Sequence, residues 1–234
     1  MRARINSWRD RFRAIKPLVR INLFILLAAV GVFIAIADRV ADGDHLELEE
    51  KIMASLRTGE PVRAAGPAWL PHIARDVTAM GSVTVLTTLT FLVIGFLALT
   101  HRYGAALFLA CAAGGGQALN ASLKAYYRRE RPDPAFRWTD IDSLSFPSGH
   151  ATSSAVTYLV IAVLLSRLVE KNSERAYIIG GALVISFLVG LTRVYLGVHY
   201  PTDVIAGWAV GIAWAQFCWF VAHAVGRRRL AHTT

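Results

Sequence analysis

The sequence predicts an all-α, polytopic membrane protein with six transmembrane helices and short outer amphipathic helices. Three observations lead to this fold class. The chain of 234 residues is 55% hydrophobic with a mean hydropathy of +0.44, which is more apolar than soluble domains of this size. Its apolar residues gather in stretches that approach the roughly 20 residues needed to cross about 30 Å of hydrocarbon. Short polar loops separate most of these stretches.

The six predicted spans follow one another without an internal repeat. They cover residues 18–37, 83–99, 105–123, 150–169, 176–197 and 203–224. The third and fifth spans are the least apolar, and their small residues allow neighbouring helices to approach closely. We therefore divide the chain into a basic amphipathic tail, a six-span membrane domain and a second basic tail, at residues 1–17, 18–224 and 225–234.

The first span also has features of a secretory signal peptide. A basic segment precedes it, and the sequence AIA stands directly before Asp38, as at a cleavage site. Its apolar run is longer than that of a usual signal peptide, which favours an uncleaved anchor.

Two further segments have the pattern of amphipathic helices. Apolar residues recur at helical spacing among arginines at residues 5–15, which is typical of a helix lying on an anionic membrane surface. Residues 45–59 are predicted to form a short outer helix. A solvated connector is the alternative interpretation of both segments.

The formal net charge of +9 comes from arginine and lysine that flank the apolar stretches. Such charge orients a membrane protein and contacts anionic lipid, so no nucleic-acid partner is expected. Both tails and the loops after the second and fourth spans are basic, and six crossings put them all on one side. The positive-inside rule makes that side the cytoplasm. We expect a bacterial inner-membrane protein with both termini in the cytoplasm.

One basic loop, at residues 124–138, lies on the outer, periplasmic side by this count. Its charges therefore have a function other than orientation, and anion binding is the natural one. Lys124 and Arg131 are assigned to that function. Arg128 and Arg129 are interpreted as cations that extend to the membrane interface from a helix end.

Three groups of polar residues stand at the predicted outer ends of spans, and they meet at one site if these helices are neighbours. The groups are Lys124 with Arg131 and Pro132, then Pro147, Ser148, Gly149 and His150, and then Arg193, His199 and Asp203.

The residue types in these groups suit phosphoryl transfer. A phosphate whose charge spreads over its oxygens needs cationic donors from several directions, and Lys124, Arg131 and Arg193 supply them. The two arginines have forked donors suited to bidentate contact. Ser148 and Gly149 precede a helix, so their backbone N–H groups and the positive end of the helix dipole can face an anion.

The third group supplies a nucleophile. A ring nitrogen of His199 can form a covalent phosphoryl intermediate, and Asp203 is spaced to fix its tautomer and stabilise the positive ring. His150 protonates the leaving oxygen as general acid and later helps to activate water. This cycle needs no metal, and no cofactor is predicted. Cys111 and Cys218 lie in apolar stretches, which favours packing over a disulfide or a thiolate metal site.

In order and spacing, the three groups resemble the signature of the type 2 phosphatidic acid phosphatase superfamily. That signature is Lys, six residues, Arg-Pro; then Pro-Ser-Gly-His; then Ser-Arg, five residues, His, three residues, Asp. The one departure is Thr192, where the family usually has serine, and the hydroxyl group is kept. The motifs extend from Lys124 to Asp203, and the six-span layout carries the match over nearly the whole chain.

The resemblance implies a six-helix membrane fold, a metal-independent site facing outward and a phosphohistidine at His199. It implies a hydrolase whose lipid phosphate substrate enters from the bilayer. The candidates are phosphatidic acid, phosphatidylglycerophosphate, diacylglycerol pyrophosphate and undecaprenyl pyrophosphate. One alternative is a phosphotransferase that passes the phosphoryl group to a lipid or sugar. Another is a lipid-binding or lipid-moving protein without activity, which the presence of His150, His199 and Asp203 disfavours.

Overall fold

The computed structural model describes residues 17–43, 47–59, 63–137 and 143–231. The predicted amphipathic segment at residues 5–15 lies outside these ranges. The elements within them are α2 (Pro17–Ala41), α3 (Glu47–Ser55), β1 (Arg57–Thr58), β2 (Arg63–Ala64), α4 (Leu70–Ala79), α5 (Val83–Leu99), α6 (Tyr103–Tyr127), η1 (Pro134–Phe136), α7 (Gly149–Leu165), α8 (Asn172–Tyr195) and α9 (Pro201–Ala231).

Each of the six predicted spans coincides with a helix, namely α2 or one of α5 to α9. Helices α2, α6, α8 and α9 are each long and apolar enough to cross a membrane, and α4 with α5 makes a fifth candidate that is bent by 41°. Helix α7 has 17 residues, about 26 Å of helix, which is less than the hydrocarbon layer of about 30 Å. The protein is therefore a multi-pass membrane protein with four or five candidate spans among the described residues, and the count of six is not confirmed.

Short elements lie outside the spans. Helix α3 confirms that residues 45–59 contain a short helix, and its acidic first turn suits the positive end of the helix dipole. The antiparallel pair β1–β2, with Arg57 opposite Ala64, was not predicted, because strands of two residues carry no alternating pattern. Helix α4 was not predicted either.

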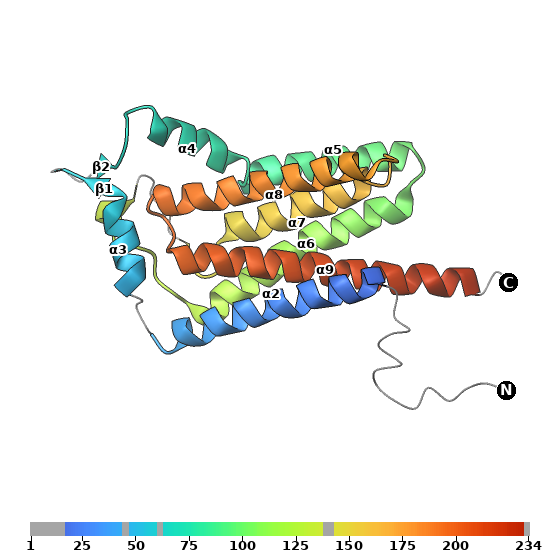
Figure 1. The fold of residues 1–234 in the computed structure, drawn as a ribbon, viewed down its shortest axis with the longest axis horizontal. Coiled ribbons are helices and arrows are strands. Elements are labelled where there is room, and N and C mark those ends of the chain that lie inside the picture. Colours follow the sequence, from blue (N-terminus) through green and yellow to red (C-terminus); the bar gives the residue numbers. More distant parts are fainter. Residues whose placement is uncertain (1–16, 44–46, 60–62, 138–142, 232–234) are drawn as a thin grey trace.

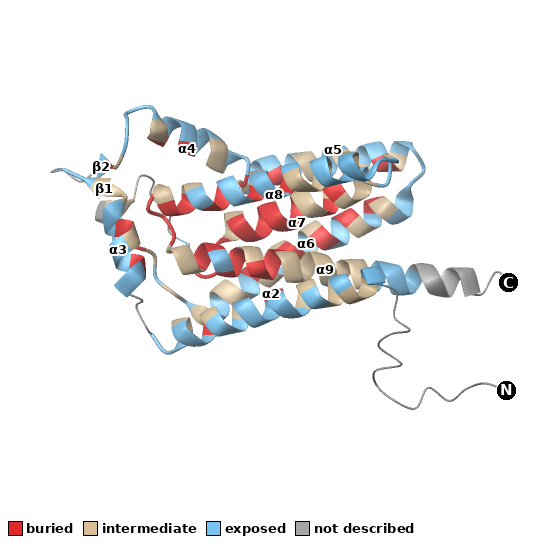
Figure 2. Ribbon diagram, viewed as in Figure 1, coloured by how far each residue is buried: buried red, intermediate tan, exposed pale blue. Residues whose placement is uncertain are grey.

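The helices run side by side as a bundle (Figure 1). Helix α2 begins and α9 ends at one end of the bundle. At the opposite end α6 and α8 end, α7 and α9 begin, and α3 and the β1–β2 pair lie close by (Figure 1). Helix α7 is central, since it contacts α6, α8 and α9, while α2 packs along α9. Figure 2 shows buried residues concentrated in α7 and in the adjoining parts of α8 and α9.

The outer faces of the bundle are apolar. Phe24 and Leu27 in α2, and Phe91 and Leu92 in α5, are exposed large hydrophobic side chains. Water would hydrate such surfaces unfavourably, whereas lipid chains cover them at little cost. This pattern agrees with a bundle that is embedded in a bilayer.

Two glycines let α9 approach α7 closely. A Cβ atom on Gly207 would lie 2.7 Å from the carbonyl oxygen of Ser148, and one on Gly211 would lie 2.7 Å from Ala155 Cβ. Larger residues would hold the helices apart. The close approach allows the Ser148 backbone N–H to donate to the carbonyl oxygen of Asp203 at 2.9 Å. The starts of the two helices are thereby joined.

Candidate active site

The three polar groups lie together at the end of the bundle where α6 and α8 end and α7 and α9 begin (Figure 1). Arg131 Nη1 lies 3.2 Å from His199 Nε2, and Asp203 Oδ2 lies 3.4 Å from His199 Nδ1. The charges of Arg131, Asp203 and Arg193 all act on the ammonium group of Lys124. The residues that the motifs single out therefore form one cluster.

His199 stands in the turn between α8 and α9, and it is 1% exposed. Gly197 makes this turn possible, because it has a φ of +75° and its Cβ would lie 2.0 Å from the Phe136 carbonyl oxygen. Only glycine adopts this conformation readily and leaves that space open. Arg57 donates to the same carbonyl at 2.7 Å and to that of Tyr195 at 3.0 Å, which ties the end of α8 to η1.

The two ring nitrogens of His199 have different neighbours. Nδ1 lies 3.4 Å from Asp203 Oδ2 and 3.2 Å from Ser145 Oγ. The same carboxylate oxygen accepts the Ser145 hydroxyl and, at 2.9 Å, the backbone N–H of Tyr200. Nε2 faces Arg131 Nη1, which can only donate. We assign the ring proton to Nδ1 from these neighbours, which leaves the lone pair on Nε2.

The surroundings keep this ring neutral. Burial lowers the pKa of His199 to about 3, although the Asp203 carboxylate opposes the shift, and the positive charges of Arg131 and Arg193 lower it further. At pH 7 the Nε2 lone pair is therefore available to attack. Burial also lowers the pKa of Arg131 to about 10, so its guanidinium stays charged at pH 7.

Lys124 and Arg131 hold the loop that precedes α7. Lys124 Nζ donates to the carbonyl oxygens of Leu144 and, at 3.3 Å, Ser145. Arg131 Nε and Nη2 donate to the backbone and the side chain of Ser143 at 2.5 Å and 2.9 Å. These acceptors are neutral, so they hold the two cations without cancelling their charge.

Two buried side-chain atoms within the described ranges have no hydrogen-bond partner, Ser148 Oγ and Arg193 Nε. Buried polar atoms are usually paired, because an unpaired one costs about 1–3 kcal/mol. Both atoms can donate a hydrogen bond, and both residues belong to the predicted phosphate-binding set. Thr78 accepts a hydrogen bond of 3.1 Å from Arg193 Nη1, which orients that guanidinium. The two unpaired donors match an anion as ligand.

The structure corrects one detail for Ser148. The sequence predicts that its backbone N–H faces an anion, but this group donates to the Asp203 carbonyl oxygen at 2.9 Å. The side-chain hydroxyl is the donor that is left. Gly149 is the first residue of α7, and N–H groups in the first helical turn have no acceptor within the helix. The amide and dipole contribution to anion binding is therefore assigned to Gly149 and the turn that it begins.

His150 lies in the first turn of α7 and is half-buried. A Cβ atom on Gly81 would lie 3.3 Å from its Cδ2, so the turn between α4 and α5 packs on this ring. The charges of Arg193, Arg131 and Lys124 act on His150. This position is compatible with proton transfer between His150 and a phosphate that those cations bind.

Arg129 contradicts its interpretation as an interfacial cation. Its side chain is 9% exposed, and its guanidinium lies 2.6 Å from Glu49 Oε2 and 2.7 Å from Asp203 Oδ1. Arg128 caps the end of α6 in a left-handed conformation, with a φ of +51°, and the chain turns there. The residue after this turn points inward while Arg128 stays exposed.

Sequence reasoning also missed three partners of the site, Glu49, Ser145 and Thr78. Ser145 stands two residues before Pro147, so its place in the loop was a signal that could have found it. Glu49 and Thr78 lie in outer helices with no motif around them. Only the tertiary structure brings them to the site.

The ionic groups of the cluster are mostly positive. Two carboxylates, of Asp203 and Glu49, stand against four cations, which are Lys124, Arg129, Arg131 and Arg193. In the part of the chain that the structure describes, no set of three or more His, Cys, Asp or Glu side chains is arranged to hold a metal ion. This donor set suits a phosphate better than a divalent cation.

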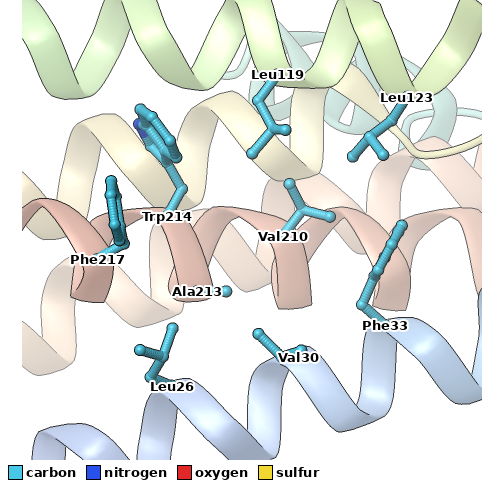
Figure 3. A pocket seen from close by; sticks show the side chains of 9 residues that line it. All are labelled: Leu26, Val30, Phe33, Leu119, Leu123, Val210, Ala213, Trp214 and Phe217. Carbon is cyan, nitrogen blue, oxygen red and sulfur yellow. The ribbon is translucent and has the colours of Figure 1, made fainter.

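An apolar groove of about 310 Å³ lies between α2, α6 and α9. Figure 3 shows the nine side chains that line it, all of them aliphatic or aromatic. Phe33 in this groove stacks on Phe146 with ring centroids 5.9 Å apart, and Phe146 directly precedes the Pro-Ser-Gly-His segment. Such a lining cannot bind a phosphate but suits a hydrocarbon chain. One lining residue of the groove, Phe33, is therefore in contact with the loop of the polar cluster.

Comparison with known proteins gives one family. The model of the PAP2 superfamily matches residues 102–227, which is more than half of the chain. Phosphatidylglycerophosphatase B of Bacillus subtilis is 35% identical over 147 residues, which cover 62% of this chain and 71% of that protein. Decaprenylphosphoryl-5-phosphoribose phosphatase of Mycobacterium tuberculosis is 33% identical over 121 residues, 50% of this chain and 62% of that protein.

A solved structure has the same fold. It is that of a transmembrane PAP2 type phosphatidylglycerolphosphate phosphatase from Bacillus subtilis. The TM-score is 0.71 at 27% identity, and the match covers 86% of this chain and 96% of that one. The match extends well beyond residues 102–227, so it includes helices outside the segment that carries the motifs.

Proposed function

The chain belongs to the PAP2 superfamily, and from this premise we propose that it is a membrane lipid phosphatase that works through a phosphohistidine. The observation that carries the proposal is the environment of His199. One nitrogen of this buried ring faces Asp203, and the other faces the cation cluster. A neutral nucleophile beside several cationic donors is what attack on a phosphate dianion requires.

In the first step, His199 Nε2 attacks phosphorus and the bond from phosphorus to the lipid oxygen breaks. His150 takes up a proton when the phosphate dianion binds beside it and offsets the surrounding cations, and it gives that proton to the departing alkoxide as general acid. Asp203 stabilises the positive ring that forms with the P–N bond. Lys124, Arg131 and Arg193 balance the charge on the equatorial oxygens.

In the second step, neutral His150 takes a proton from water, and the water oxygen attacks phosphorus on the face opposite His199. The P–N bond breaks and its electron pair returns to Nε2. Inorganic phosphate leaves, His150 is again protonated, and His199 is again neutral. The products are inorganic phosphate and the lipid alcohol, so the cycle balances without a further reactant.

The substrate that we propose is a lipid phosphomonoester, with phosphatidylglycerophosphate first among the candidates. The named activities of the two relatives support a phosphomonoester on a lipid anchor. The apolar groove supports a substrate that arrives from the bilayer with its chains along the helices. The basic tails precede the start of α2 and follow span α9 in the sequence, and α2 begins and α9 ends at the end of the bundle opposite the polar cluster (Figure 1). This supports a cytoplasmic location for both termini and an outer location for the site.

The test is release of inorganic phosphate by the purified protein in detergent micelles. The panel holds phosphatidic acid, phosphatidylglycerophosphate, diacylglycerol pyrophosphate and undecaprenyl pyrophosphate. We expect turnover of at least one of them, fastest for phosphatidylglycerophosphate, and none by His199→Ala. His101→Ala is the matched control, because that exposed histidine lies at the other end of the bundle. Equal rates for wild type and His199→Ala would refute the assigned nucleophile, and no release from any lipid would refute the function.

A further inference from the structure

We propose that Glu49 and Arg129 are positioning residues for Asp203, so that outer helix α3 takes part in the reaction without touching the phosphate. Neither residue stands at a motif position. The inference rests on the proposed function, and it assigns an effect on turnover to a helix that the motifs leave out.

A continuous series of contacts leads from α3 to His199. Arg129 Nη2 lies 2.6 Å from Glu49 Oε2, and its Nη1 lies 2.7 Å from Asp203 Oδ1 and 2.8 Å from Thr202 Oγ1. Glu49 Oε1 accepts the backbone N–H of Thr202 at 3.1 Å and also its hydroxyl. The side chains of Glu49, Arg129 and Asp203 are 4%, 9% and 0% exposed. Water therefore competes little for these contacts.

Each oxygen of Asp203 has its own partners, so the carboxylate cannot rotate without losing both sets. Oδ2 faces His199 Nδ1 and accepts from Ser145 and from the backbone of Tyr200. Oδ1 is held by Arg129. The Arg129 guanidinium carbon Cζ lies over the Tyr200 ring, 4.3 Å from its centroid. This cation–π contact also holds the Arg129 guanidinium in place. Arg129 thus sets the plane of the carboxylate that holds the His199 tautomer.

Glu49 preserves the negative charge of this arrangement. Arg129 alone would neutralise Asp203, whereas two carboxylates and one guanidinium leave one negative charge. That charge stabilises the positive ring when the P–N bond forms. Burial disfavours the charged guanidinium, but the carboxylates of Asp203 and Glu49 outweigh this and raise the pKa of Arg129. The guanidinium is therefore charged at neutral pH.

The experiment compares Glu49→Gln, Arg129→Gln and the double variant with wild type on the lipid phosphate that wild type turns over. We expect kcat to fall about a hundredfold in each, because a misplaced catalytic group costs that much. KM should stay unchanged, because Lys124, Arg131 and Arg193 are intact. The control is Glu47→Gln, since Glu47 lies on the same helix and its recorded ion pair is with exposed Lys51. We expect it to behave as wild type.

The double variant separates positioning from simple stability. It removes the Glu49–Arg129 pair together and keeps the wild-type net charge of Glu49, Arg129 and Asp203, which is one negative charge. A merely structural role therefore predicts that its melting temperature and kcat recover together. Positioning predicts that the melting temperature recovers while kcat stays low. Wild-type kcat in Glu49→Gln, or recovery of kcat in the double variant, would overturn the inference.

A second readout does not depend on turnover. In protein labelled with ¹⁵N-histidine, and assigned with His199→Gln, the Nδ1–H signal of His199 should shift or broaden in Glu49→Gln and stay fixed in Glu47→Gln. An unchanged signal in Glu49→Gln would overturn the inference even if wild type released no phosphate. Absence of phosphate release by wild type, with the signal shifted in Glu49→Gln, would overturn the proposed function and leave the positioning supported.

Discussion

At the scale of single residues, the account depends on two unlike nitrogens in one buried ring. His199 is surrounded by a carboxylate on one side and a guanidinium on the other, both within 3.4 Å. Burial and the nearby arginines outweigh the carboxylate and keep the ring neutral. The same surroundings that make it a nucleophile therefore determine how it responds to pH.

The His199 ring should remain neutral well below its ordinary pKa of about 6.5. Its pKa of about 3 predicts that the ¹⁵N shifts of this ring do not change between pH 8 and pH 5. The measurement is a pH titration of ¹⁵N-histidine-labelled protein without substrate. A His199 midpoint near pH 6.5 would contradict the assigned environment.

This depressed pKa also sets the sign of a stability change. Between about pH 6.5 and the folded-state pKa of about 3, the unfolded chain binds a proton at this histidine and the folded chain does not. The free energy of unfolding therefore falls as pH falls through this window, by up to about 1.4 kcal/mol per unit for this group. His199→Gln should flatten the decline in melting temperature from pH 7 to pH 5. An equally steep decline in the variant would show that other groups cause it.

Gly197→Ala should damage the site through the backbone. The added Cβ would lie 2.0 Å from the Phe136 carbonyl oxygen, and the φ of +75° disfavours any L side chain. We expect a lower melting temperature and at least about a tenfold loss of kcat, because the turn that carries His199 has to move. Gly181→Ala is the control, as it lies in α8 with no atom within 4 Å of its Cβ. Wild-type activity in Gly197→Ala would show that the turn is not so constrained.

The motif residues could be predicted from the sequence because their spacing along the chain reflects their chemistry. Arg129 could not, because two adjacent arginines look alike until the left-handed turn at Arg128 shows which one is buried. Glu49 was also hidden, since its partners Arg129 and Asp203 come from distant segments. Polar residues whose role is to support another residue leave no local pattern.

At the scale of elements, the short helix α7 connects the proposed general acid His150 to the start of α9, where Asp203 lies. The first turn of α7 carries His150. The backbone N–H of Ser148, directly before this turn, donates to the Asp203 carbonyl oxygen at the start of α9. Glycines on α9 make this contact possible, so the packing of two helices determines the position of the anion-binding turn.

Gly211→Leu should separate α7 from α9. A Cβ here would already lie 2.7 Å from Ala155 Cβ and 2.8 Å from the Thr152 carbonyl oxygen. Overpacking of this kind costs about 1–3 kcal/mol, and we expect a lower melting temperature together with a loss of activity. Gly31→Leu in α2 is the control, because it has no neighbouring atom within 4 Å. A stable and active Gly211→Leu protein would mean that the contact does not position the site.

Long apolar helices were predictable because a span of hydrocarbon needs a long apolar run, and α5 has the bounds that were predicted. The short elements outside the long helices were harder to predict. Helix α3 was found through its pattern, while α4 and the two-residue strands were missed because few residues define them. The count of six crossings is not confirmed, since α7 is shorter than a usual span.

At the scale of the whole molecule, the bundle combines a polar cluster at one end with an apolar groove between α2, α6 and α9. The groove between α2, α6 and α9 has an apolar lining (Figure 3), and its residue Phe33 stacks on Phe146 in the loop of the site. This arrangement suits a substrate with a charged headgroup and a hydrocarbon anchor. It also requires that the cluster end face one defined side of the membrane.

We expect that side to be the outer one. A fluorescent protein fused to the C-terminus should fluoresce, because it folds only in the cytoplasm. A cysteine introduced at exposed Thr58, in β1 near the site, should react with a membrane-impermeant maleimide in intact cells, after Cys111 and Cys218 are changed to alanine. Labelling only after the cells are permeabilised would show the opposite orientation, with the site on the cytoplasmic side.

The central claim is that His199 carries the phosphoryl group, and its most direct test is to trap that group. Wild-type protein mixed with ³²P-labelled lipid phosphate and quenched in alkali should hold label that is stable to base and released by acid, as for a P–N bond. The label should map to the peptide that contains His199 and be absent from His199→Ala. Turnover by wild type with no trapped label, or label on any other residue, would contradict the account.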